Sequence, residues 1–82
     1  MNAVLQIPPQ LPAVAQAKLV LMQALSARIA ARWPTASRAA IELDFGENRL
    51  SSLAAGDYEK FSLAWLIMLA EKLNARITIT VE

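Results

Sequence analysis

Apolar residues in the first half of the chain recur with helical spacing. From Ala13 or Ala15 to Arg32 they fall at intervals of three and four, which places them on one helix face: Leu19, Met22, Leu25, Ile29 and Ala30. We expect this helix to end before Pro34, because a residue that precedes proline avoids helical backbone angles. The pattern therefore predicts one long amphipathic helix, and Trp33 is expected to cover the core.

Two short helices joined by a tight turn are predicted next, over residues 37–43 and 47–54, with the turn at residues 44–46. The Thr35 hydroxyl is expected to cap the first of them, and Gly56 to end the second. Each helix has one apolar face, formed by Ala40 and Leu43 in the first and by Leu50 and Leu53 in the second. We expect these faces to be buried against the rest of the domain.

The other side of the second short helix is polar. It carries Glu47, Asn48, Arg49, Ser51 and Ser52. This is the layout of a helix-turn-helix, whose second helix enters the major groove of DNA. Asparagine can pair bidentately with adenine and arginine with guanine, so Asn48 and Arg49 are candidate base readers.

A fourth helix is predicted over residues 63–73, after a cap at Ser62. It is apolar nearly all round, which indicates burial on more than one side and, in a chain this short, a dimer interface. The residues after it alternate between apolar and polar, which predicts a β-strand over residues 76–81. This strand must pair with another strand, which is either the same strand of a second copy or residues 3–7. The predicted dimerisation residues are Trp65, Met68, Ile77, Ile79 and Val81.

The first fourteen residues differ from the rest of the chain. Prolines at positions 8, 9 and 12 exclude a regular helix there. The segment is either a flexible tail or an arm that docks on the domain or on a partner. We therefore divide the chain into an N-terminal arm, residues 1–14, and one domain, residues 15–82.

Composition supports self-association more than it supports a nucleic-acid partner. Apolar residues make up 56% of the 82 residues and charged residues 18%, whereas typical domains have about 45–50% and about 25%. A domain of this size hides only about 60% of its unfolded surface, so a second copy is the simplest cover for the excess. The net charge is +1. Any basic surface must therefore come from local clustering.

Several function classes lack their usual residues. The chain has no cysteine and no histidine, which removes the commonest metal ligands and general base. It has only two glycines and no phosphate-binding loop. We therefore expect no enzyme activity, no cofactor and no metal. The longest apolar run, residues 63–70, is far shorter than a membrane span, and no signal peptide is recognisable, so a cytoplasmic protein without a membrane partner is expected.

Residues 17–81 resemble the Xre/Cro-type helix-turn-helix regulators, particularly the small antitoxin-like group. That group reads roughly T-Q-x-x-A-A-x-x-L-G-I-S-Q-x-x-V-S-x-L-L-x-G, then F-S, a leucine-rich helix and a short strand. The residues in register are Thr35, Ala39, Ala40, Leu43, Phe45, Leu50, Ser51, Leu53, Gly56, Phe61 and Ser62. The resemblance implies a mainly α, four- to five-helix Cro/repressor-like helix-turn-helix domain, with a C-terminal β-strand paired across a dimer.

The resemblance also implies a site and partners. The start of the first short helix would approach the phosphate backbone of double-stranded DNA, which makes Thr35, Ser37 and Arg38 candidate phosphate contacts, with Ser51 and Ser52 beside them. It implies a sequence-specific transcriptional regulator and allows an antitoxin-type repressor with a toxin as partner.

Two departures from the family pattern favour another function. Ala36 and Glu47 stand where the family has glutamines that contact phosphate and base. Glu47 has three open roles, which are to accept a hydrogen bond from cytosine, to orient Arg49, or only to suit the positive end of its helix. The alternative function is a protein–protein interaction module on a helix-turn-helix fold that has lost DNA binding.

Overall fold

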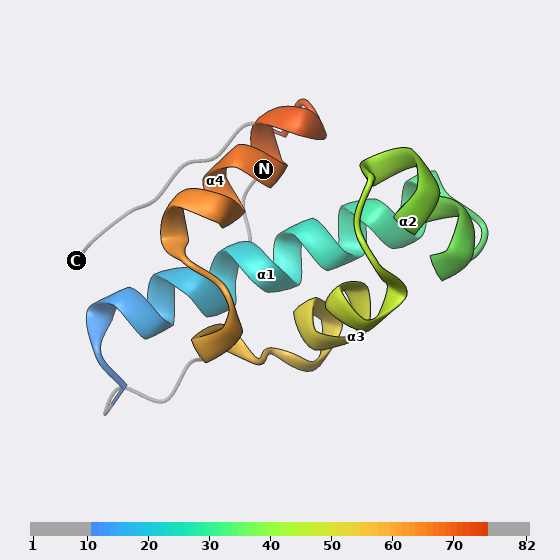
Figure 1. Ribbon diagram of the computed structural model, residues 1–82. Helices are drawn as coiled ribbons and strands as arrows, with labels where there is room; N and C mark the ends of the chain where they lie inside the picture. The colour runs from blue at the N-terminus through green and yellow to red at the C-terminus, as the bar shows by residue number, and fades with distance from the viewer. Residues whose placement is uncertain (1–10, 76–82) are drawn as a thin grey trace.

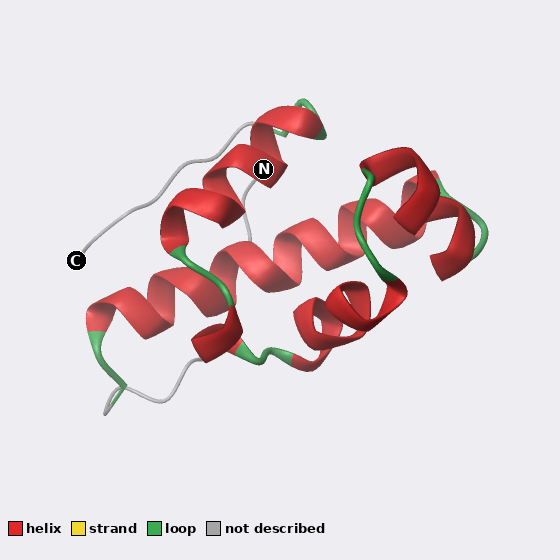
Figure 2. Ribbon diagram, in the orientation of Figure 1, coloured by secondary structure: helices red, strands yellow, loops and turns green. Residues whose placement is uncertain are grey.

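The computed structural model describes residues 11–75 of the chain, and these residues form a helical domain (Figure 1). Its elements are α1 (Ala13–Arg32), α2 (Ala36–Leu43), α3 (Glu47–Ala55), the 3₁₀ helix η1 (Tyr58–Lys60) and α4 (Leu63–Lys72). Between residues 11 and 75 the chain is helix joined by short loops, with no strand (Figure 2). The mainly α prediction is thus confirmed for this part of the chain. The predicted strand at residues 76–81 and most of the N-terminal arm lie outside the described residues.

Helix α1 is the central element of the fold. α3, η1 and α4 all pack on it, and α2 packs on α3 (Figure 1). The buried face of α1 is formed by Ala15, Leu21, Met22, Leu25 and Ile29. The apolar spacing had placed Ala30 on this face, but Ala30 is exposed, because the neighbouring helices cover the side of α1 that includes Leu21 instead. α1 therefore positions both α3 and α4, which lie on either side of it in Figure 1.

The ends of the helices follow the local chemistry of the sequence. The hydroxyl of Thr35 accepts a hydrogen bond from the Arg38 backbone N–H at 3.1 Å, and that of Ser62 accepts one from the Trp65 N–H at 3.0 Å. Gly56 ends α3 with a left-handed backbone at φ +78°, a conformation that costs glycine little. Asp44 ends α2 in the same way at φ +60°. The caps predicted at Thr35, Gly56 and Ser62 are therefore confirmed. The 3₁₀ turn at η1 was not predicted.

Helix α4 has two different faces within one chain. Leu66, Leu69 and Ala70 are buried in the core. Met68 is 58% exposed and Ile67 37% exposed. The expectation that α4 is buried on more than one side is therefore not met by the described chain alone, since nothing in residues 11–75 covers Met68. No helix in these residues is long and apolar enough to cross a membrane.

Candidate nucleic-acid interface

The α2–turn–α3 unit, residues 35–56, has an apolar inner side and a polar outer side. On the inner side the buried residues are Ala39, Ala40 and Leu43 from α2, and Leu50 and Leu53 from α3. α2 packs on α3 along this side. Leu50 and Leu53 orient α3 against the core, and Glu47, Asn48 and Ser51 are exposed on its other side.

Seven of the eight predicted contact residues are exposed on this unit. Ser52 is the exception, since it is half-buried. The exposed residues are Thr35, Ser37 and Arg38 at the start of α2, and Glu47, Asn48, Arg49 and Ser51 on α3. The fold thus brings the predicted residues into one region, at the start of α2 and along α3.

Glu47 connects the starts of the two short helices. The Ser37 Oγ donates a hydrogen bond to the Glu47 Oε1 at 2.6 Å. Its carboxylate also lies in the first turn of α3, where negative charge is favourable. Of the three roles left open for Glu47, orienting Arg49 is not the one observed, because the Arg49 guanidinium lies over the rings of Phe61 and Trp65. The carboxylate instead joins α2 to α3.

Arg38 has an acidic neighbour on its own helix. Its guanidinium lies 3.5 Å from the Glu42 carboxylate, and the two side chains are 62% and 46% exposed. An exposed pair at this spacing contributes only about 0.3–0.5 kcal/mol. Arg38 therefore has an acidic partner but remains available to bind DNA, because a phosphate group can displace the Glu42 carboxylate at a small cost in free energy.

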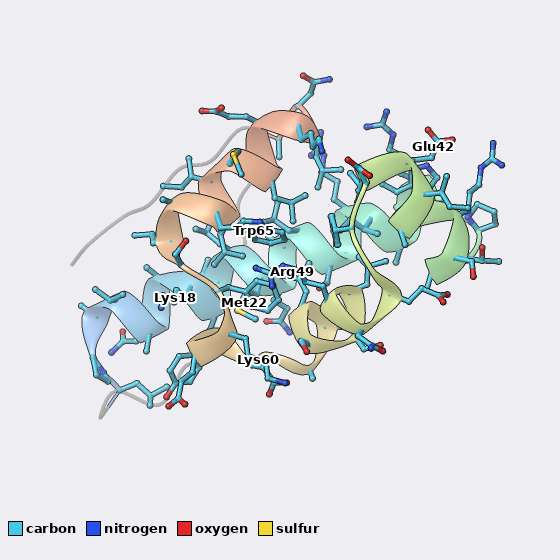
Figure 3. All side chains as sticks on the ribbon, viewed as in Figure 1. Lys18, Met22, Glu42, Arg49, Lys60 and Trp65 are labelled. Atoms are coloured by element: carbon cyan, nitrogen blue, oxygen red, sulfur yellow. The ribbon has the colours of Figure 1, made fainter. Side chains whose placement is uncertain are left out.

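Arg49 lies against an aromatic cluster, Phe45, Phe61 and Trp65. Its guanidinium carbon is 4.5 Å from the centre of the Trp65 ring and 4.9 Å from that of Phe61. Phe45 meets Trp65 edge to face at 5.5 Å, and Phe61 lies 5.1 Å from it. Figure 3 shows Arg49 next to Trp65, on the side of α3 that faces α4. Sequence reasoning missed this cluster, because no local spacing relates Arg49 to Trp65.

A groove lies between the turn and α4, and we call it the turn–α4 groove. It has a volume of about 570 Å³, with an apolar surface that includes Phe45, Trp65 and Met68. Arg49 and Lys72 also line it. The Lys72 ammonium donates to the Leu43 carbonyl oxygen at 2.9 Å, which places a positive charge at the C-terminal end of α2. α4 therefore contacts the α2–turn–α3 unit through polar and aromatic side chains.

The predicted dimerisation residues divide into three groups. Trp65 is half-buried in the aromatic cluster of its own chain, so packing within the chain accounts for much of its apolar surface. Met68 is exposed and remains a candidate for contact with a second copy. Ile77, Ile79 and Val81 lie outside the described residues.

Comparisons with known proteins add no assignment. No family model, curated protein or solved structure matches the chain. Within residues 11–75 there is also no group of three or more His, Cys, Asp or Glu side chains that would hold a metal ion. The functional interpretation therefore depends on the geometry of the α2–turn–α3 unit and its charges.

Proposed function

We propose that the chain is a cytoplasmic, sequence-specific DNA-binding regulator that reads the major groove with α3. The observation that carries the proposal is the placement of α3, whose leucines are buried against α1 while Asn48 and Ser51 are exposed. A short helix with a polar outer side, preceded by a capped helix and a tight turn, is the arrangement that presents side chains to base edges.

Asn48 is the base reader that the geometry favours most. It is exposed on the first turn of α3, and no hydrogen bond within residues 11–75 engages its amide. An asparagine in this position pairs bidentately with the N6 and N7 atoms of adenine. Thr35, Ser37 and Arg38 would contact or flank the phosphates, where the start of α2 favours an anion.

Asn48→Ala tests the proposal on the best DNA site selected from a random pool. We expect a loss of about 1–3 kcal/mol in binding free energy and a relaxed preference at one base pair, because two hydrogen bonds to one base disappear. Fluorescence anisotropy with labelled duplexes measures both. Gln23→Ala is the matched control, since it removes an exposed amide from α1. Equal losses for the two variants, or an unchanged base preference for Asn48→Ala, would contradict base reading.

The proposal extends to a dimer with two copies of α3. Two α3 helices related by a two-fold axis would enter successive major grooves about 34 Å apart and read a palindromic site. The exposed Met68 on α4 and the high apolar content of the chain support a second copy. An antitoxin-type repressor with a toxin partner is the form of this function that the family resemblance suggests.

Three observations favour a protein–protein interaction module instead. Residues 35–55 contain two arginines and three carboxylates, a net charge of −1. Arg38 is paired with Glu42, and Ile41 on α2 is 73% exposed. A surface with this charge gains little from phosphate neutralisation. The salt dependence of binding separates the two functions, because each neutralised phosphate contributes a slope of about −0.9 in log K against log salt, whereas an apolar protein interface depends weakly on salt.

A further inference from the structure

Helices α3 and α4 both pack on α1 more extensively than on each other. Side chains nevertheless connect α4 with the α2–turn–α3 unit at two places besides Arg49. Lys72 reaches the carbonyl of Leu43, and Trp65 meets Phe45 in the turn. Arg49 adds a connection from α3 itself, to Trp65 on α4 and to Phe61 just before α4.

The position of the Arg49 guanidinium differs from that expected of a base reader. It lies over two rings on the α4 side of α3, and it forms no ion pair within residues 11–75. Adjacent residues of a helix point about 100° apart, so Arg49 and Asn48 face different directions. Arg49 is exposed, and at an exposed site such a contact contributes about 0.5–1 kcal/mol, which the guanidinium forfeits when it leaves the rings for a base edge.

Helix α3 has few restraints of its own. It is nine residues long, and its N-cap is Gly46, which supplies no side-chain hydrogen bond. Helices this short are marginal without tertiary contacts. Leu50 and Leu53 fix its contact with α1, and the hydrogen bond from Ser37 to Glu47 joins its first residue to α2. A contact between Arg49 and α4 would therefore restrict any further rotation of the first turn of α3, where Asn48 lies.

We propose that Arg49 is a positioning residue, which holds the first turn of α3 against Trp65 and Phe61 so that Asn48 faces the DNA. This inference depends on the proposed DNA-binding function. Asn48 then determines the base preference, and the affinity for DNA depends on Trp65, a residue of α4.

A double-mutant cycle on DNA affinity tests this role. The four proteins are the wild type, Arg49→Ala, Trp65→Leu and the double variant, compared on the selected site at a temperature where circular dichroism shows each of them folded. We expect each single variant to lower the affinity about tenfold and the double variant to lower it no further, because both remove the same contact. The base preference, measured by repeating the selection, should be unchanged for Arg49→Ala. Additive losses, or a relaxed base preference for Arg49→Ala, would overturn the positioning role.

Two further variants separate positioning from loss of charge. Arg32→Ala is the matched control, because the Arg32 guanidinium lies 4.8 Å from the centre of the Trp33 ring, away from the aromatic cluster. We expect it to weaken DNA binding less than Arg49→Ala. Arg49→Lys keeps a cation over the rings and should retain most of the affinity. Equal losses for Arg32→Ala and Arg49→Ala would overturn the inference.

A measurement without DNA distinguishes failure of this inference from failure of the proposed function. In a Trp33→Phe background, the fluorescence emission comes from Trp65. Arg49→Ala should shift this emission, whereas Arg38→Ala, which removes an arginine paired only on its own helix, should not. If the wild type selects no DNA sequence but the emission shifts, the proposed function fails and the Arg49–Trp65 contact stands. If DNA is selected and the emission is the same in both variants, positioning by Arg49 is contradicted.

Discussion

Helices α3 and α4 are nearly equal in length, with nine and ten residues, but they differ in their N-terminal caps and in the residues that they bury. α4 begins at a serine cap and buries Leu66, Leu69 and Ala70. α3 begins at a glycine, buries two leucines and leaves most of its polar residues exposed. α4 thus buries one residue more than α3, and the contacts of Glu47 and Arg49 with neighbouring elements add to the smaller burial of α3. A helix that presents polar groups to a partner has less area to bury, so other parts of the fold must hold it.

The largest expected effect concerns the core side of α4. Leu66 is fully buried, so Leu66→Ala should lower the free energy of unfolding by about 2–5 kcal/mol through lost burial and a cavity. Urea unfolding followed by circular dichroism measures this loss. Ile41→Ala removes the same number of carbon atoms from a residue of α2 that is 73% exposed, and it should change stability by about 0.5 kcal/mol or less. Similar losses for the two variants would mean that a partner or a second copy covers Ile41.

The N-terminal caps of α3 and α4 offer a test of the difference between these two helices with a smaller expected effect. Ser62→Ala removes the hydrogen bond to the Trp65 N–H and should cost about 1 kcal/mol. Gly46→Ser gives α3 the cap that it lacks. The site has room for a Cβ, so it should stabilise the protein by about 0.5 kcal/mol.

Gly56→Ser is the control for Gly46→Ser, because Gly56 has a left-handed backbone. It should destabilise by about 1 kcal/mol. Thermal unfolding of the three variants measures these changes. A destabilising Gly46→Ser would show that α3 does not accept a side-chain cap at its start.

The sequence predicted the helices well because local chemistry ends them. Thr35 and Ser62 accept the expected backbone hydrogen bonds, and Gly56 and Asp44 adopt the left-handed backbone that ends a helix. The exposed outer side of α3 was also predictable, since Leu50 and Leu53 define its inner side. These features depend on residues that are close in the chain.

The sequence did not predict which groups meet between helices. The contact of Arg49 with Trp65 joins residues of α3 and α4, whose approach depends on how both pack on α1. The hydrogen bond from Ser37 to Glu47 depends on the path of the turn. The apolar pattern of α4 did not distinguish its buried side from the exposed Met68, because an all-apolar helix has no polar side to mark the solvent.

Selection of duplexes from a random pool by the full chain tests the central claim most directly. If α3 reads the major groove, the pool converges on one short motif, repeated with two-fold symmetry at a spacing of about one helical turn, since two copies bind successive grooves. A pool that stays random after repeated rounds at moderate salt, with protein that circular dichroism shows to be folded, would contradict DNA reading by this chain.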